Sequence, residues 1–447
     1  MPDASALVSL RDSGTLVHIG ADGSVSEVGE IPGVTGGGSG GFLGLTPTEG
    51  GLLGLAASPD FTEDRLVYAY LTAAQENRVV RLTFDGTSLG EPEVVLDAIP
   101  TANIHNGGRI AFGPDGYLYV TTGDASDQGL AQEIGALNGK ILRVTLDGQP
   151  APGNPFAGSP VWTLGHRNVQ GIGWDDEGRM YASEFGQNRF DELNLIEPGG
   201  NYGWPVVEGD GGGDEYVDPL LTWEPAEASP SGITVHGGAV YVAGLRGQRL
   251  WQVPVAGVGE VGEPQAYLTG EYGRLRAVEI APDGSLWVLT NNTDSRGDPR
   301  PGDDRILPLA DLLVRIHERY GRPMIVAETS GLEGGREDWL RDVVQEGLAA
   351  VNRGVDLHAI CMFPAVDMPD WHTGEWLNNG ICDLIAQPDG ALKRVPFQPY
   401  VDELRRWQRE LKRVTVLDED PFDQPVDLED VVEAARRLAP KSDADWH

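Results

Sequence analysis

The chain has 447 residues, more than one compact core usually serves, so we expect more than one domain. Its 69 acidic residues against 33 Lys and Arg give a formal net charge of −36, which disfavours nucleic acid and anionic membranes as partners and is typical of a very soluble surface. No apolar run approaches the ~20 residues of a membrane span. The opening residues, MPDASALVSLRDSG, show no signal peptide, and Cys361 and Cys382 alone give no disulfide framework.

A repeated unit fills the chain up to residue 307: an apolar strand, a tight turn and a second apolar strand. The 61 glycines and 31 prolines suit such a turn-rich β architecture. A truncated copy that lacks its first strand opens the chain at Pro2, and full copies begin at Leu52, Arg109, Gln170, Ser231 and Arg276. The turns recur about every 50 to 60 residues, at Asp3, Asp60, Asp115, Asp176, Gly237 and Asp283.

Each hairpin is followed by a second pair of strands, for example NRVVRLTFDG from Asn77 and GKILRVTLDG from Gly139. Two pairs make a four-stranded sheet, and a recurring four-stranded sheet is the unit of a β-propeller. The sequence therefore predicts a mainly β protein, with a six-bladed β-propeller over residues 1–307 whose first blade is incomplete.

The pattern changes near Pro308, where helices begin to alternate with apolar strands. We expect helices over residues 309–321, 337–354 and 400–413, and buried strands over 322–330 and 356–367. This predicts a smaller α/β segment over residues 308–416. Residues 417–447 are expected to form an acidic peripheral tail with one short helix near Leu428–Leu438.

Polar side chains fall at the ends of the predicted inner strands. His105 precedes one such strand and Asp124 follows the next, so antiparallel pairing brings both to the same rim. A carboxylate beside an imidazole fixes its tautomer and raises its basicity, as a general base requires. The alternative is that His105 caps a turn and Asp124 begins the next one.

Basic side chains recur at equivalent positions of other copies, an unusual feature in so acidic a chain. Clustered guanidinium groups suit a ligand with several carboxylates, because each binds a carboxylate through two hydrogen bonds. The alternative is that each arginine pairs with a nearby Asp or Glu. The residues are Arg167 with its neighbour Asn168, Arg246, Arg274 and Arg276.

Three long stretches carry a family resemblance: IHNGGRIAFGPDGYLYVTTGDA from Ile104, LGHRNVQGIGWDDEGRMYASEFGQNRFDELNLIEPGGNYGWP from Leu164, and GRLRAVEIAPDGSLWVLTNN from Gly273. They occur in order at the right intervals, and the resemblance covers roughly residues 2–307. The stretch resembles the soluble glucose/sorbosone dehydrogenases, six-bladed propellers that use pyrroloquinoline quinone (PQQ) and calcium. Such relatives are commonly exported.

The resemblance implies a role for each rim residue. His105 would be the base that takes a proton from the anomeric hydroxyl of a sugar, and Asp124 would orient it. Hydride would pass to PQQ, and a separate electron acceptor would reoxidise the cofactor. Arg167 and Asn168 would contact the quinone. The remaining cofactor-binding residues would be Arg246, Arg274 and Arg276.

The resemblance also implies metal and substrate contacts. The active-site calcium would take main-chain carbonyls of Gly186 and Gln187, where it would act as a Lewis acid. Glu208 and Asp210 align with a second, structural calcium loop of some relatives. Glu49 stands where relatives contact substrate. Ile104 replaces a carboxylate of some glucose-specific members, so we expect a broader range of aldose substrates.

The C-terminal part resembles the last two units of a glycosidase-type (β/α)8 barrel, joined to the propeller as in a fusion or chimera. Glu328 would then be the strand-end nucleophile, but retaining hydrolysis needs a second carboxylate about 5 Å away, and the strand that would carry it is absent. Three classes of function remain open: a PQQ sugar dehydrogenase, a calcium- or ligand-binding propeller without redox chemistry, and a carbohydrate-binding or hydrolytic role of the C-terminal part.

Overall fold

The structure is a computed structural model, and it describes residues 1, 5–20, 24–35, 48–281, 286–294, 296–300, 303–307, 324–329, 336–352, 354–362, 368–369, 376–377, 382–386 and 392–414. The chain divides into two compact units, Met1–Leu312 and Leu313–His447. Each unit has hydrophobic residues packed into a core of its own.

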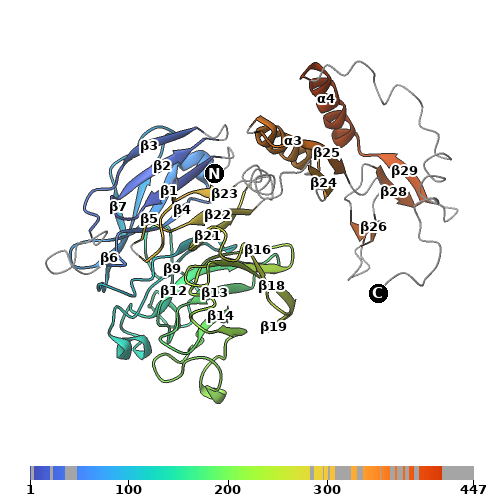
Figure 1. Cartoon of the computed structure of the whole chain (residues 1–447). Coiled ribbons are helices and arrows are strands. Elements are labelled where there is room, and N and C mark those ends of the chain that lie inside the picture. The colour runs from blue at the N-terminus through green and yellow to red at the C-terminus, as the bar shows by residue number, and fades with distance from the viewer. Residues whose placement is uncertain are drawn as a thin grey trace. The chain divides into compact units, whose positions relative to one another are not determined.

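The first unit is built from antiparallel sheets of short strands, joined by tight turns and by longer loops (Figure 1). The first sheet has strands β1 (Ala6–Leu10), β2 (Thr15–Ile19) and β3 (Val25–Glu30). The second has β4 (Leu52–Ala57), β5 (Leu66–Thr72), β6 (Asn77–Thr83) and β7 (Glu93–Ile99), with the short helix α1 (Phe61–Asp64) in its first connection. The third has β8 (Ile110–Phe112), β9 (Leu118–Thr121), β10 (Lys140–Val144) and β11 (Val161–Leu164).

Three further sheets follow in chain order. The fourth has β12 (Val169–Trp174), β13 (Met180–Glu184), β14 (Asp191–Ile196) and β15 (Leu221–Trp223). The fifth has β16 (Pro230–His236), β17 (Ala239–Gly244), β18 (Arg249–Gly257), β19 (Glu260–Val261) and β20 (Gln265–Tyr267). The last has β21 (Leu275–Ile280), β22 (Leu286–Thr290) and β23 (Ile306–Leu307). Two 3-10 turns, Gln128–Gln132 and Gly213–Glu215, lie in the connections.

The first strands of consecutive sheets touch one another, from β1 to β4, β8, β12, β16 and β21. Two of these contacts bring backbones so close that only glycine fits. A Cβ on Gly54 would lie 2.2 Å from the carbonyl oxygen of Gly108, and one on Gly171 would lie 2.5 Å from that of Ser231. The loops that precede each first strand are therefore gathered at one end of the unit.

The mainly β prediction is confirmed, but strand numbers differ between sheets. We expected four strands in each complete sheet, whereas β18 pairs with both β19 and β20 and gives the fifth sheet five. This is possible because β18 spans nine residues, long enough to carry two partners in succession. In the described residues the first sheet has three strands, and so does the last, whose copy was expected to be complete.

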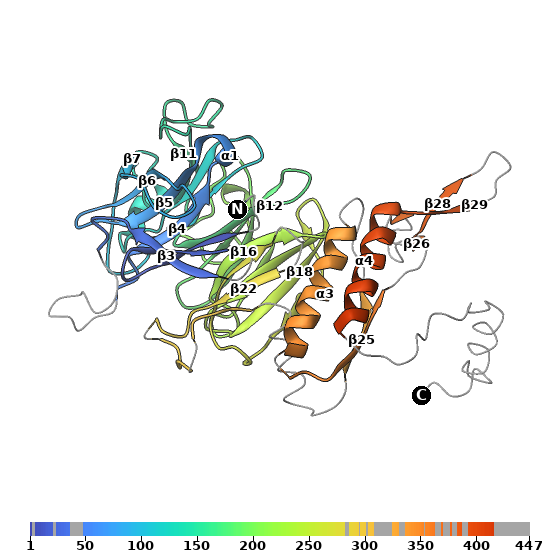
Figure 2. The same ribbon diagram turned by 90° about the horizontal axis from the view of Figure 1, so that it is seen from above.

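The second unit contains helices and short strands. Strands β24 (Met324–Thr329) and β25 (Leu357–Met362) pair in parallel, and α3 (Arg336–Asn352) connects them. Figure 2 shows α3 beside α4 (Gln398–Val414), and the two helices share a core of Leu340, Val344 and Tyr400. Two antiparallel pairs were not predicted: β26 (Met368–Pro369) with β27 (Trp376–Leu377), and β28 (Cys382–Ala386) with β29 (Leu392–Pro396).

Some predictions for this unit lie outside the described residues, namely the helix over 309–321 and the tail 417–447. Glu328 lies in β24, of which the structure describes the main chain. None of the helices in the described ranges has both the length and the apolar character to cross a membrane.

Candidate active site

His105 and Asp124 form a hydrogen-bonded pair at the ends of the third sheet's first two strands. His105 Nδ1 lies 2.8 Å from Asp124 Oδ1, and Asp124 is fully buried. Burial alone would raise the pKa of Asp124, but His105 and further donors outweigh it and lower the pKa; Trp204 Nε1 donates to Oδ2 at 2.9 Å. Because an ionised carboxylate only accepts, the proton of a neutral His105 lies on Nδ1, and Nε2 is left as the basic atom.

The main chain of His105 is held in an uncommon conformation. Its φ is +61°, and its N–H donates to Glu49 Oε2 at 2.9 Å. The opposite oxygen of Glu49, Oε1, forms an ion pair with Arg296 at 2.9 Å. Gly123 packs against the His105 carbonyl so closely that a Cβ there would lie 1.9 Å from the oxygen. Glu49 therefore lies beside the candidate base, with both carboxylate oxygens already engaged.

Arg167 lies next to this pair. Its carbonyl oxygen accepts the N–H of Asp124 at 2.8 Å, and its guanidinium lies 5.5 Å from the Trp204 ring centroid. Nη1 donates to the carbonyl oxygens of Phe185 at 3.2 Å and Gly186 at 2.6 Å. Burial lowers the pKa of Arg167, and surrounding carboxylates, Asp124 first among them, act in the opposite direction. Its buried Nε has no partner among the described residues.

Asn168 and Arg276 belong to one hydrogen-bonded network. Asn168 Oδ1 accepts the Gly107 N–H at 3.0 Å and Gln170 Nε2 at 3.1 Å. Gln170 Oε1 in turn accepts from Arg276 Nη1 at 3.0 Å. Burial and the nearby Arg109 lower the pKa of Arg276 to about 10. The Nδ2 of Asn168 is buried without a partner in the described part of the chain, a donor that an acceptor ligand would satisfy.

Arg274 and Arg246 differ in their surroundings. Arg274 is buried and donates to Asp294 Oδ2 through Nε at 3.1 Å and Nη2 at 2.9 Å. Arg274 therefore pairs with a nearby carboxylate, which is the alternative considered for each arginine. Asp294 also acts on the pKa of Arg276, in opposition to the larger lowering by burial, so the two arginines lie near the same carboxylate. Arg246 is exposed after β17, and no polar contact joins it to the residues of this network within the described ranges.

The four candidate metal ligands fall into two groups. The Gly186 carbonyl faces Arg167, while Glu208 Oε1 accepts the backbone N–H groups of residues 187–190 at 2.7, 3.0, 3.0 and 3.3 Å. Glu208 therefore fixes the loop that contains Gln187. Asp210 is exposed and has no polar contact among the described residues. The described chain holds no group of three or more His, Cys, Asp or Glu side chains suited to a metal ion.

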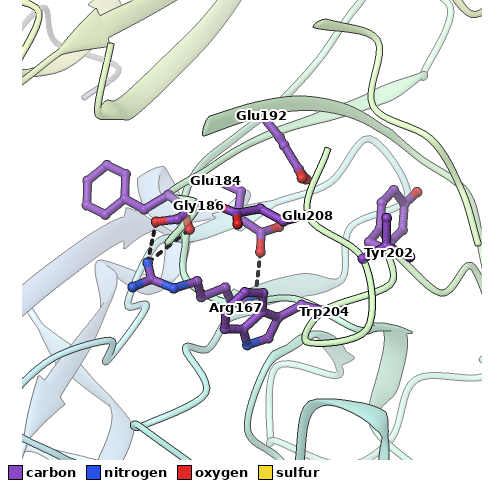
Figure 3. A pocket seen from close by; sticks show the side chains of 9 residues that line it. Arg167, Glu184, Gly186, Glu192, Tyr202, Trp204 and Glu208 are labelled. Carbon is purple, nitrogen blue, oxygen red and sulfur yellow. Dashed lines mark hydrogen bonds between the residues drawn. The ribbon is translucent and has the colours of Figure 1, made fainter. Parts of the chain in front are cut away.

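A small pocket adjoins Arg167 and is also lined by Trp204 and Glu208 (Figure 3). Sequence reasoning missed two buried carboxylates that line it, Glu184 at the end of β13 and Glu192 in β14. The only available signal was the dense acidic pattern of SEFGQNRFDE, which places no side chain. Burial raises the pKa of Glu192 to about 8, and the neighbouring Glu184 adds to this rise.

Residues 1–298 match the model of the glucose/sorbosone dehydrogenase family, and the chain belongs to that family. Among curated proteins, an uncharacterised Synechocystis protein is 33% identical over 293 residues, covering 56% of this chain and 70% of that protein. Quinoprotein glucose dehydrogenase B of Acinetobacter calcoaceticus is 32% identical over 243 residues. That match covers 46% of this chain and 49% of the relative, so it spans about half of that protein's length.

Solved structures are similar over the same region. The PQQ-bound form of an aldose sugar dehydrogenase from Streptomyces coelicolor is 54% identical, with a TM-score of 0.65 over 69% of this chain and 91% of that one. A glucose dehydrogenase-like oxidoreductase from Thermus thermophilus is 45% identical, with a TM-score of 0.63 over 68% of this chain and 93% of that one. The fold of this region is therefore that of the PQQ β-propeller proteins, and those of the relatives above that are named for an activity are glucose or aldose sugar dehydrogenases.

Proposed function

We propose that this chain is a PQQ-dependent dehydrogenase of aldose sugars, built on a six-bladed propeller. The observation that carries the proposal is the His105–Asp124 pair beside Arg167, with the Asn168–Arg276 network continuing from the same loop. The family and the PQQ-bound neighbour supply the class of reaction.

The side chains present fit an anionic quinone. Arg167 Nε and Asn168 Nδ2 are buried donors without partners in the described ranges, and an acceptor-rich ligand would satisfy both. Arg276 supplies further guanidinium donors for a carboxylate group, and Arg274 would do so alongside its ion pair with Asp294. When bound, PQQ supplies the two-electron acceptor for the hydride that leaves the anomeric carbon.

The protein's own part in the reaction is proton transfer. Nε2 of His105 accepts the proton of the anomeric hydroxyl while that carbon loses hydride, so the aldose leaves as a lactone. Asp124 keeps the Nδ1 proton in place and stabilises the imidazolium that forms. Ile104 and the already engaged Glu49 favour a broad range of aldoses over glucose alone.

Calcium is part of the proposal through main-chain oxygens. The carbonyls of Gly186 and Gln187 are ligands of the kind calcium prefers, and Glu208 holds the loop that carries Gln187. The Gly186 carbonyl accepts a hydrogen bond from Arg167, which a calcium ion would replace. Glu208 uses one oxygen to accept four N–H groups, so we assign it to loop support rather than to the ion.

The test is an absorbance titration of the purified chain with PQQ in calcium, followed by aldose and an artificial electron acceptor. We expect saturable PQQ binding and sugar oxidation, and we expect His105→Ala to abolish oxidation while leaving PQQ binding intact. His236→Ala, at an exposed histidine ending β16, is the matched control. Reconstituted wild type that binds PQQ without oxidising any aldose would contradict the proposal; failure to bind PQQ would favour a propeller without redox chemistry.

A further inference from the structure

A second histidine–carboxylate pair is buried behind the first. His166 Nδ1 lies 2.8 Å from Glu184 Oε2, and His166 Nε2 lies 2.8 Å from Thr163 Oγ1. His166 is fully buried, Glu184 is 4% exposed, and the His166 ring stacks on Tyr202 with centroids 4.6 Å apart. The pair is too deeply buried to meet a substrate, so its role must act through its neighbours.

The second oxygen of Glu184, Oε1, accepts the backbone N–H of Arg167 (Figure 3). The carbonyl of the same residue accepts the Asp124 N–H at 2.8 Å, and Asp124 holds His105 at 2.8 Å. Direct contacts therefore run from Glu184 through the Arg167 main chain to Asp124 and then to the imidazole of His105.

We propose that Glu184, oriented by His166, is a positioning residue that fixes the main chain of Arg167 and thereby sets the His105–Asp124 geometry. The kinetic part of this inference rests on the proposed function; the geometric part does not. Strand β13 ends at Glu184, so the fourth sheet supplies a rigid anchor for the Arg167 main chain. This anchor adds to the backbone hydrogen bonds that His166 makes to Gly139 and Asn168 makes to Phe185.

Two substitutions separate positioning from charge. In Glu184→Gln the amide oxygen still accepts the Arg167 N–H. The amide N–H₂ still bonds His166 if the ring moves its proton to Nε2 and donates to Thr163. Glu184→Ala removes both hydrogen bonds. A positioning role therefore predicts that Glu184→Gln keeps the His105–Asp124 geometry and that Glu184→Ala loses it. A purely electrostatic role predicts that the two variants are impaired equally.

The first readout is NMR of protein labelled with ¹⁵N-histidine and free of cofactor. The His105 Nδ1–H, identified by its absence in His105→Gln, is expected to give a downfield proton signal because it bonds a buried carboxylate. We expect Glu184→Ala to broaden or shift this signal and Glu184→Gln to retain it. Glu177→Ala, at an exposed carboxylate in the turn of the same sheet that pairs with Arg179, is the matched control.

The second readout is steady-state oxidation by the PQQ-loaded protein. A displacement of about 1 Å at a catalytic group can cost on the order of 100-fold. We therefore expect kcat to fall about 10- to 100-fold in Glu184→Ala, with KM for the sugar within about threefold, and to fall no more than about threefold in Glu184→Gln. If Glu184→Ala fails to fold, His166→Phe keeps the stacking on Tyr202 and should reproduce the same changes at reduced size.

An unchanged His105 signal in Glu184→Ala or His166→Phe would overturn the inference, and so would equal losses in Glu184→Gln and Glu184→Ala. Wild-type protein that lacks sugar oxidation while its His105 signal still responds to Glu184→Ala would reject the proposed function and leave the positioning role standing.

Discussion

His105 and Asp124 are 19 residues apart in the chain, yet the third sheet brings His105 Nδ1 within 2.8 Å of Asp124 Oδ1. Trp204, which lies 80 residues after Asp124 in the chain, donates a hydrogen bond to the other oxygen of the Asp124 carboxyl group. The carboxyl group therefore cannot rotate freely, and the tautomer of His105 is set by the fold.

Asp124→Asn tests this relationship. The amide N–H₂ would either face Trp204 Nε1, which is also a donor, and lose that hydrogen bond, or face His105 Nδ1. In the second case Nδ1 must accept, so the ring proton moves to Nε2 and removes the basic atom. We expect kcat for sugar oxidation to fall about 10²- to 10⁴-fold, the usual contribution of a general base, with PQQ affinity little changed. Absorbance titration and steady-state rates measure the two effects; a variant with normal kcat would show that Asp124 does not orient His105.

Arg276 and Arg246 offer a contrast between a buried and an exposed guanidinium. Loss of hydrogen bonds from a charged group costs about 1.5–3 kcal/mol, so Arg276→Ala should weaken PQQ binding roughly 10- to 150-fold. Arg246→Ala should weaken it less than threefold, because that side chain is exposed and makes no polar contact with the Asn168–Arg276 network in the described residues. Equal losses in the two variants would restore the cofactor-binding role that the resemblance implies for Arg246.

Glu49 is expected to contact substrate, and in the structure its oxygens bond the His105 N–H and Arg296. If holding the main chain is its main role, Glu49→Gln should keep most of kcat, because the amide oxygen still accepts the N–H. Glu49→Ala should lose about 10-fold or more. KM values for several aldoses provide the comparison: a rise in KM with kcat unchanged in both variants would mean that Glu49 binds sugar directly.

The mainly β architecture was predictable because tight Asp-Gly and Gly-Gly turns recur at a fixed spacing, and turn chemistry is local. The position of His105 and Asp124 followed from the same pattern, since antiparallel strands return their ends to one rim. Contacts between loops of different sheets were not predictable. The Asp124 N–H meets the Arg167 carbonyl, and Arg296 meets Glu49, through sheet-to-sheet packing that no local pattern encodes.

In the second unit, the strand pair β24–β25 and helices α3 and α4 fall where apolar periodicity indicated them. The hairpin β28–β29 was missed. Its segment IAQPDGALK reads as a turn, but the flanking strands are short and their apolar and polar residues do not alternate regularly.

Substitutions of Glu208 and Asp210 test which of the two acidic residues supports calcium binding. Glu208→Ala would remove the acceptor of four backbone N–H groups and free the loop that carries Gln187. We expect the calcium concentration that half-saturates PQQ binding to rise about 10-fold or more in this variant. Asp210→Ala, at an exposed side chain two residues away, is the control and should change it little. Titrating calcium into chelator-treated protein with PQQ measures both; a larger loss in Asp210→Ala would favour a second calcium loop there.

Glu192 makes stability depend on pH. An unfolded glutamate titrates near ~4.3, whereas burial and the neighbouring Glu184 raise the pKa of folded Glu192 to about 8. The folded state thus binds this proton more tightly, so its contribution to stability is full below pH ~4 and is lost as pH rises to about 8. The neighbouring Asp191, whose pKa burial raises to about 6, adds a loss in the same direction.

Glu192→Gln is neutral at every pH and should abolish the Glu192 part of this loss. We expect wild-type protein to lose several degrees more of melting temperature between pH 5 and 8 than Glu192→Gln does. The Asp191 contribution is common to both proteins and cancels in the comparison. Glu197→Gln, at an exposed carboxyl just beyond the end of β14, should follow the wild-type curve. Parallel curves for wild type and Glu192→Gln would show that Glu192 is ionised in the folded protein, and that the pocket beside Arg167 is better solvated than its burial indicates.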